Sequence, residues 1–547
     1  MRYAMLGLIL ALNLTVMLVT AETAAAASVK LTNEQCEADR SQLIHCGSAP
    51  SAFFSENGSL WVTFEYQQHV WMSRSADNGQ TYTPATRVTH AAENIEINGE
   101  NRPKIIVDEA GATIYVSWTQ KTAGMHTGDI RFTRSTDAGV SFEPARTIND
   151  DGLLTSHRFE SMFLSASGLL YLTWLDKREL EYAATRGEPY RGSGVFYTYS
   201  EDQGANFANN RKIADHSCEC CRIAVAPHGQ DGMALLWRHV FDTNTRDHAI
   251  ATVNRDQVNA LTRASNDDWN IDACPHHGPT MVSSPSADDV YHLGWFSAGN
   301  INQGIYYGRH DLRERSTSQL MQIDGNPGAG HPSISAHNGQ LYIVWKRFNG
   351  VGTDLLMIVS ADEGESWSDE TVVATTDGGA DHPLLTAGPD GLFVSWMTQA
   401  DGYRFVRVSG TNADIRAFTA DTFSRIKQDR AGEAFLVSLW SVDCPPCLVE
   451  LDMLGRLLKE QPSLPLVLIS TDDIRQSEDA MDFLLDYGLE GITSWMFADS
   501  FAERLRFSID PQWFGELPRS YYFDEQHQHQ AHSGILEESM VRAWLNL

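Results

Sequence analysis

The sequence predicts two domains of different class: a large all-β propeller, with seven blades favoured and six possible, followed by a small α/β domain. Three observations carry this prediction. A short strand ending on an aromatic residue recurs seven times, a turn motif built on Ser, Asp and Gly recurs four times, and a strand-helix-strand-helix pattern with a Cys-x-x-Cys motif follows residue 411. A chain of 547 residues also exceeds what one hydrophobic core usually holds.

The aromatic strands set the period of the repeat. They end on Phe64, Trp118, Trp174, Trp237, Trp295, Trp345 and Trp396. Successive copies lie 50 to 63 residues apart, the length expected of one four-stranded blade. Six blades would result if the first and last copies shared one blade, and residues 28–31 are a candidate strand to close the ring.

The turn motif reads Ser-x-Asp-x-Gly-x-x-aromatic. Its copies run from Ser75 to Tyr82, Ser135 to Phe142, Ser200 to Phe207 and Ser360 to Trp367. We expect each to be a hairpin between the outer strands of a blade, with Asp binding backbone N–H groups and Gly at positive φ. The four segments resemble the Asp-box (BNR) repeats of sialidase-like propellers over roughly residues 45–410. Asp boxes occur in glycosidases and in non-enzymes, so the resemblance implies a fold and no activity.

The N-terminus has the pattern of a secretory signal peptide. Met1-Arg2 precedes an apolar run from Leu6 to Val19 and a run of alanines at residues 24–27. The apolar run is shorter than the ~20 residues of a membrane span, so we expect an exported chain, periplasmic or secreted, with no membrane span after cleavage. The predicted domains are a signal peptide at residues 1–27, the propeller at 28–411 and the second domain at 412–547.

The charge balance excludes two classes of partner. Acidic residues number 71 against 41 basic ones, a formal charge of −30. Such a chain repels phosphate backbones and anionic lipid surfaces, so we expect neither nucleic acid nor a membrane as a partner.

Cys36 and Cys46 flank a short loop near the predicted start of the mature chain. A disulfide is the default for such a pair in an exported protein. The alternative places Cys46 in the centre of the propeller.

The centre of the propeller is a predicted metal site. The innermost strand of each blade starts near the axis, and six of the seven predicted strand starts carry His or Cys. The candidate ligands are Cys218, Cys220, Cys221, Cys274, His276, His277, His157, His331 and His382. Thiolates with imidazoles suit a soft or borderline metal, so we expect copper as Cu(I), with zinc second and no organic cofactor. The alternative is a disulfide from Cys218 or Cys220 to Cys274, with the histidines as polar turn residues.

A glycosidase is an alternative function. Arg102 resembles the first of the arginines that bind the substrate carboxylate in sialidases, and Arg158 and Arg222 occupy similar strand starts. The pattern then departs from that family, because His331 and His382 stand where further arginines are expected. No Tyr/Glu nucleophile pair can be assigned.

The second domain carries the strongest chemical motif. A buried strand, AFLVSLW, leads into Cys444-Pro-Pro-Cys447 and a helix, and a second strand and a helix at residues 477–487 follow. A helix N-terminus stabilises a thiolate, which makes Cys444 the expected attacking thiol and Cys447 the resolving one. A plain structural disulfide or a Cys-x-x-Cys metal site is the alternative.

This segment resembles the thioredoxin fold, and more closely its TlpA/ResA-like exported branch, over about 130 residues. Glu450, three residues beyond Cys447, is one of the features that carry the resemblance, and the resemblance implies that Pro518, in Glu-Leu-Pro-Arg-Ser-Tyr, is the cis-proline facing the sulfurs. Cys444, Cys447, Pro518 and Glu450 are therefore the expected catalytic residues.

Taken together, the motifs predict an extracytoplasmic thiol-disulfide oxidoreductase coupled to a Cys/His metal site, most simply copper, in the propeller. The expected partner is an exported thiol or metal-site protein. A sialidase-like glycosidase and a non-catalytic binding scaffold are the alternatives.

Overall fold

The computed structural model describes residues 31–545 apart from 109–110, 390, 411–414, 462–463, 490–491 and 500. The predicted signal peptide lies outside these residues, as do three of the four residues of the proposed closing strand; the fourth, Leu31, belongs to no strand. None of the helices in the described ranges is both long and apolar enough to cross a membrane.

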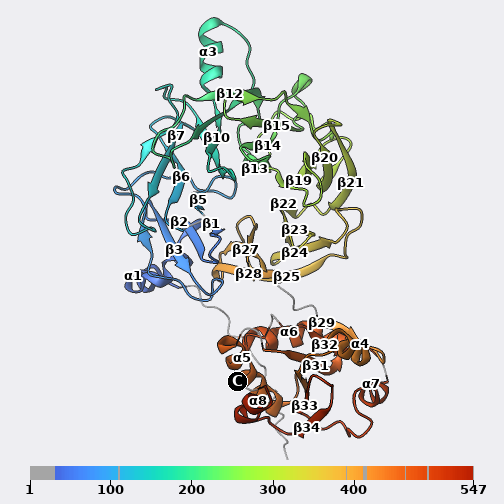
Figure 1. Cartoon of the computed structure of the whole chain (residues 1–547). Coiled ribbons are helices and arrows are strands. Elements are labelled where there is room, and N and C mark those ends of the chain that lie inside the picture. The colour runs from blue at the N-terminus through green and yellow to red at the C-terminus, as the bar shows by residue number, and fades with distance from the viewer. Residues whose placement is uncertain are drawn as a thin grey trace, which may run out of the picture.

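Seven antiparallel sheets follow one another along the chain and form a ring (Figure 1). The first three are β1 (Ser48–Phe54) to β4 (Thr86–Arg87) with β2 (Leu60–Tyr66) and β3 (His69–Ser75); β5 (Lys104–Val107), β6 (Ile114–Lys121), β7 (Gly128–Ser135) and β8 (Arg146–Thr147); and β9 (His157–Leu164), β10 (Leu170–Asp176), β11 (Ser193–Ser200) and β12 (Arg211–Ser217). The prediction of seven blades is confirmed.

The remaining blades continue in the same order. They are β13 (Ala224–His228), β14 (Gly232–Arg238), β15 (His248–Asn254), β16 (Gln257–Val258) and β17 (Thr262–Arg263); β18 (Thr280–Ser283), β19 (Val290–Ala298), β20 (Gln303–Asp311) and β21 (Ser316–Asp324); β22 (Ala329–His337), β23 (Gln340–Phe348), β24 (Gly352–Ser360) and β25 (Thr371–Asp377); and β26 (Leu384–Gly388), β27 (Gly391–Thr398) and β28 (Gly402–Gly410). The short helix α3 (Arg178–Arg186), between β10 and β11, projects from the rim in Figure 1.

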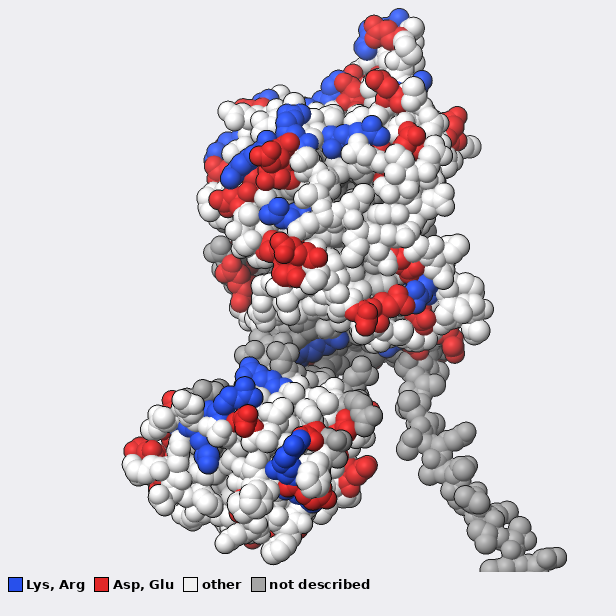
Figure 2. Space-filling model, turned by 90° about the vertical axis from the view of Figure 1, so that its right-hand side faces the viewer, with Lys and Arg blue, Asp and Glu red and all other residues white. Residues whose placement is uncertain are grey.

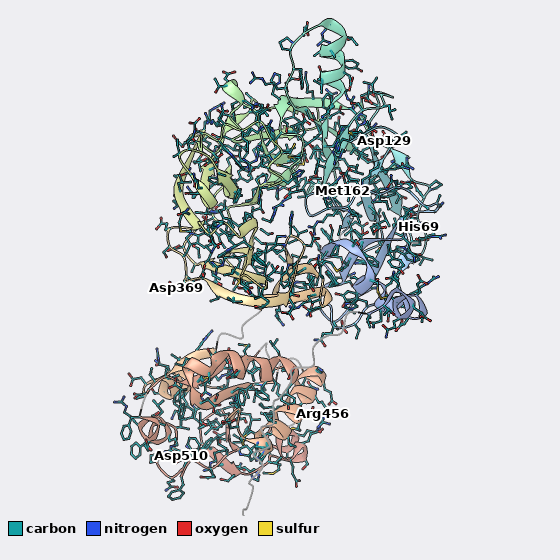
Figure 3. All side chains as sticks on the ribbon, turned by 180° about the vertical axis from the view of Figure 1, so that it is seen from behind. His69, Asp129, Met162, Asp369, Arg456 and Asp510 are labelled. Atoms are coloured by element: carbon teal, nitrogen blue, oxygen red, sulfur yellow. A yellow bond between two sulfur atoms is a disulfide. The ribbon has the colours of Figure 1, made fainter. Side chains whose placement is uncertain are left out.

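The repeated aromatic residue lies on the second strand of every blade and is fully buried. Trp118, Trp174, Trp345 and Trp396 have no exposed surface. Each blade therefore contributes one large side chain to the packing against its neighbours, which accounts for the period seen in the sequence. In Figure 3, Met162 on the inner strand β9 lies toward the middle of the ring, whereas Asp369 lies at its edge.

The Asp-box turns have the predicted hydrogen bonds and also join blades. In the first, the Ser75 hydroxyl accepts from the Gly79 N–H at 2.8 Å and Asp77 Oδ1 accepts from the Thr81 N–H at 2.9 Å. Gly79 has φ +88°, and a Cβ there would lie 2.9 Å from the ring of Phe405 on β28. The turn of the first blade therefore packs directly on the seventh.

The seventh sheet has three strands, and the ring closes by side-chain packing. β1 packs against β26 and β27, and the N-terminal helix α2 (Leu43–Cys46) packs on β28. A disulfide between Cys36, on α1 (Asn33–Ala38), and Cys46 joins the two N-terminal helices, as predicted.

A six-stranded mixed sheet follows, in the order β29-β32-β31-β30-β33-β34. Its strands are β29 (Ile415–Phe418), β30 (Phe435–Trp440), β31 (Leu466–Asp473), β32 (Ser494–Phe497), β33 (Arg519–Phe523) and β34 (His529–Ser533). Its helices are α4 (Thr422–Asp429), α5 (Pro445–Glu460), α6 (Ser477–Asp486), α7 (Ala502–Ile509) and α8 (Glu538–Leu545). Two hydrophobic clusters cover its faces, one with α5, α6 and α8 and the other with α4 and α7.

Charged side chains of both signs are mixed on one face of the molecule. On the face shown in Figure 2, Lys and Arg side chains lie among Asp and Glu side chains of the propeller. This face therefore offers no large patch of a single sign.

Candidate functional site

The predicted redox pair forms a disulfide across the first turn of α5. Cys444 is the N-cap residue, Pro445 and Pro446 begin the helix, and the Cys447 N–H points to Cys444 Sγ at 3.3 Å. Cys444 is half-buried, whereas Cys447 has no exposed surface. An N-cap sulfur faces the unpaired N–H groups of the helix, which favour its thiolate form once the disulfide is reduced.

Glu450 lies one turn beyond Cys447 and is 1% exposed. Its Oε1 accepts hydrogen bonds from Ser438 at 2.7 Å and Ser520 at 2.8 Å, and its Oε2 accepts from the Leu536 N–H at 2.8 Å. The carboxylate thus connects α5 with β30, β33 and the segment before α8.

Two further features of this domain bear on the predicted redox site. Pro518 is buried, and its peptide bond with Leu517 is cis, as the resemblance implies. Asp472, which the sequence analysis missed, accepts from the Ser441 hydroxyl at 2.7 Å and the Val442 N–H at 2.9 Å. It fixes the loop that presents Cys444.

Three of the predicted metal ligands form a buried cluster of thiols. The sulfurs of Cys218 and Cys220 lie 3.7 Å apart, those of Cys220 and Cys221 lie 3.8 Å apart, and all three are within 4.8 Å of one another. They pack with side chains of the third and fourth blades, including Trp237 on β14. Each cysteine is at most 4% exposed. The alternative disulfide to Cys274 is not formed, because all four cysteines are free.

Within this cluster, the surroundings of Cys218 favour its negatively charged thiolate form. Hydrogen bonds from Cys220 and Cys221 hold the pKa of Cys218 well below its usual value, and the positive charges of Arg238 and Arg246 add to this effect. Arg246 Nη1 donates to Cys218 Sγ at 3.2 Å. The same contact with Cys218 raises the pKa of Cys220. The surroundings therefore favour the thiolate form at Cys218 over the other two sulfurs.

Three of the predicted histidines form a second group, around Glu100. Glu100 Oε1 is 3.3 Å from Nδ1 of His331 and 3.4 Å from Nδ1 of His382. The two imidazole rings are stacked at 3.4 Å, and His277 stacks on the other side of His331 at 4.3 Å. Burial lowers the pKa of His331 and His382, and that of His277 to about 3, so the stack is neutral at pH 7.

Electrostatics make this stack a poorer cation site than the thiol cluster. Glu100 already binds Arg222, with Nη1 donating to Oε1 at 3.1 Å and the backbone N–H donating to Oε2 at 3.0 Å. Burial would raise the pKa of Glu100, but Arg222 and the imidazoles hold it well below its usual value. A metal ion bound at the histidine stack would contact the Glu100 carboxylate, whose negative charge Arg222 already balances.

The structure does not bring the other predicted ligands to either cluster. His157 is fully buried elsewhere, with Nδ1 2.9 Å from the Gly128 carbonyl and Nε2 3.0 Å from Asp151, so it holds loops together. Cys274 and His276 are exposed on the loop before β18. The structure therefore divides the ligands of the predicted single funnel site between two groups: the three cysteines pack with the third and fourth blades, whereas His331 and His382 meet Glu100.

The three arginines that resemble a sialidase triad are each paired with a carboxylate: Arg102 with Asp381 at 3.2 Å, Arg222 with Glu100, and Arg158 with Glu96. Arg102 is 3% exposed and also donates to three backbone carbonyls. A glycosidase stays a prediction. Any glycosidase site built on these three arginines would also contain the carboxylates that pair with them.

Comparisons with solved structures find distant similarities. The chain is similar to a Hadza microbial sialidase at 16% identity, with a TM-score of 0.39, covering 66% of this chain and 65% of the sialidase. It is similar to an ulvan lyase, described as a new family of polysaccharide lyase, at 11% identity and a TM-score of 0.44, covering 68% of this chain and 94% of the lyase.

A third similar structure is a secreted disulfide oxidoreductase of Mycobacterium tuberculosis, at 16% identity and a TM-score of 0.19, covering 22% of this chain and 84% of that protein. The chain spans just under two thirds of the sialidase it matches. No protein-family model and no curated protein matches the sequence.

Proposed function

We propose that the second domain is an extracytoplasmic thiol-disulfide oxidoreductase with a thioredoxin-like fold. One observation carries the proposal: a disulfide spans the first turn of α5, with Cys444 half-buried at the N-cap and Cys447 fully buried behind it. A structural disulfide needs no such asymmetry, whereas exchange needs one reachable sulfur and one protected sulfur. The mixed sheet with helices on both faces supports the fold assignment.

The reaction follows from this asymmetry. In the reduced domain, the Cys444 thiolate attacks a partner disulfide, a mixed disulfide forms, and the partner's other sulfur leaves as a thiolate. Cys447 then loses its proton and attacks Cys444 Sγ, which releases the partner as a dithiol. Two electrons pass to the partner, and the domain returns to the Cys444–Cys447 disulfide. Glu450 positions α5 against the sheet during both steps.

The test compares single substitutions in the full chain. Cys444→Ala should abolish reduction of a disulfide-bonded substrate such as insulin, because no reachable thiol remains. Cys447→Ala should instead accumulate a mixed disulfide with the substrate, seen as a mass increase that dithiothreitol removes. Cys274→Ser is the control, since it removes an exposed thiol from the propeller. Full activity in Cys444→Ala would refute the proposal.

A second candidate function is the binding of a soft metal ion by Cys218, Cys220 and Cys221. Its supporting observation is three buried sulfurs within 4.8 Å of one another, with two arginines beside them. Three thiolates around Cu(I) carry a double negative charge, which Arg238 and Arg246 would balance. We therefore propose copper first and zinc second.

The two functions suit one chain in an oxidising compartment. Two of the three thiols could form a disulfide there and cease to be ligands. The Cys444 and Cys447 thiols would return two electrons to that disulfide and restore the ligand set. This link predicts that exported Cys444→Ala protein contains more oxidised Cys218, Cys220 or Cys221 than the wild type, as counted by mass spectrometry after alkylation.

Metal analysis separates the two sets of predicted ligands. The reduced full chain, purified without oxygen and loaded with copper, should hold about one ion per chain. A Cys218→Ser/Cys220→Ser/Cys221→Ser variant should lose it, whereas the control His331→Gln/His382→Gln should keep it. Copper retained by the triple variant and lost from the double variant would place the site at the histidine stack and refute this assignment.

A further inference from the structure

The loop of residues 271–277 is bound at both ends to the two arginines that flank the thiol cluster. At one end, Arg246 Nε donates to the Ile271 carbonyl at 2.8 Å. At the other end, Arg238 Nη2 donates to the His277 carbonyl at 3.0 Å. The loop therefore lies beside the buried sulfurs, and a movement of either arginine would move it.

This loop carries the exposed metal-binding side chains of the region. Of the four free cysteines in the described part of the chain, Cys274 alone is exposed, and His276 is exposed two residues later. Arg246 Nη1 donates to Cys218 Sγ at 3.2 Å while its Nε binds the start of the loop. Arg246 is thus shared between the buried cluster and the loop that carries the exposed thiol.

A buried cluster of three thiols poses a problem of access. Cys218, Cys220 and Cys221 are almost without exposed surface, so a metal ion held by a carrier cannot contact them directly. Soft metal ions move between proteins by exchanging one thiolate ligand for another, and the first exchange needs a ligand that the carrier can reach. Cys274 is the free thiol in this region that meets that condition.

We propose that Cys274 is the transfer ligand of the thiol cluster: it takes a soft metal ion from an exported carrier and passes it to Cys218, Cys220 and Cys221. The proposal rests on metal binding by the cluster and adds a route to it. His276, on the same loop, assists the first capture with its imidazole.

The transfer is a ligand exchange without change of oxidation state. The Cys274 thiol loses its proton and displaces one carrier ligand from Cu(I). Cys218 loses its proton and bonds to the ion, and the carrier's remaining ligands leave. As Cys220 and Cys221 bind, each releases its proton to solvent; the bond to Cys274 then breaks, and Cys274 takes up a proton again. Arg246 stays hydrogen-bonded to Cys218 throughout, so the developing negative charge is balanced from the start.

The test measures loading rate and equilibrium affinity separately. The reduced full chain is mixed without oxygen with Cu(I) held by excess glutathione, and thiolate-to-copper absorption is followed in time. Cys274→Ser should slow loading by about tenfold or more, equivalent to about 1.4 kcal/mol in the barrier. Its equilibrium affinity, measured by competition with a Cu(I) chelator, should stay within about threefold of the wild type. Ala273→Ser, an exposed change on the same loop, is the matched control.

Three results would overturn the proposal, and they differ from one another. Loading of Cys274→Ser at the wild-type rate would refute the transfer role and leave the metal site intact. A loss of affinity of about 100-fold would make Cys274 a permanent ligand instead. A wild-type chain with free thiols that takes up no copper would refute metal binding itself, and the transfer role with it.

Discussion

Glu450→Gln tests the link between the buried carboxylate and the redox pair. The substitution keeps the shape of the side chain and removes its charge. An amide offers one acceptor oxygen, so it cannot serve both the two serine hydroxyls and the Leu536 N–H that the carboxylate now binds. One buried backbone donor is left facing an NH₂ group.

The magnitude follows from these three hydrogen bonds. The two that remain change from charged to neutral and lose about 1 kcal/mol each, and the orphaned N–H adds about 1–3 kcal/mol. Relief from burying a charge offsets part of this sum. We expect the free energy of unfolding of this domain to fall by about 1–3 kcal/mol, which corresponds to about 4–10 °C in Tm for about 130 residues.

Hydrogen-deuterium exchange of the full chain gives this value for the second domain alone, from peptides covering β30 and β33. Glu460→Gln, an exposed change at the end of the same helix, should alter exchange by less than about 0.5 kcal/mol. If Glu450→Gln exchanged like the wild type, and reduced insulin at the same rate, Glu450 would not hold α5 on the sheet.

Three further outcomes are expected. Arg246→Met should raise the pKa of Cys218, seen as a later rise of thiolate absorbance in a pH titration of the reduced chain. Gly99→Ala should destabilise the propeller by about 1–3 kcal/mol in urea unfolding, because its Cβ would overlap the His382 ring. Burial alone would lower the pKa of His157, but its carboxylate neighbours raise it above 6.5. The stabilisation that protonated His157 gives the folded protein is therefore complete below about pH 6.5 and is lost as the pH rises through the folded-state pKa. His157→Gln should destabilise the protein more at about pH 5.5 than at about pH 9.

Each of these has a matched control. Arg246→Lys keeps the positive charge and should leave the thiolate titration of Cys218 closer to that of the wild type. Gly379→Ala meets only the flexible end of Gln399, at 3.1 Å, and should be milder than Gly99→Ala. His90→Gln, at an exposed histidine, should show no difference between the two pH values. Equal effects in variant and control would contradict the explanation in each case.

The propeller was predictable because its signal is local and repeated. Trp174, Trp345 and the other copies lie on the second strand of each blade, where the same packing recurs, so one motif reports seven sheets. β29 was missed for the opposite reason. It has four residues, Ile415–Phe418, and its partner β32 lies more than seventy residues away in the sequence, so no local pattern marks it.

The site was predictable in its residue types but not in its grouping. Cys218, Cys220 and Cys221 are neighbours in sequence, so their proximity follows from chain connectivity. The direction of a side chain at a strand start does not follow from chain connectivity. His331 has φ +58° beside a bulge in β22, a conformation that turns it toward Glu100, and no sequence period encodes that turn. Glu100 stands directly before the Asn-Arg-Pro segment in the sequence. It could have been identified as a site residue only by asking which carboxylate pairs with the charge of Arg222.

The seam between the seventh and first blades determines where the ring opens. Five junctions lie between complete sheets, but here α2 covers β28 and the Asp-box turn of the first blade rests on Phe405. Local opening requires the loss of side-chain contacts only, so amides of β28 should exchange with solvent sooner than those of β24. The Cys36–Cys46 bond holds the N-terminal helices at this same junction. Reduction of that one bond would therefore shorten the lifetime of the closed ring while leaving every complete blade unchanged.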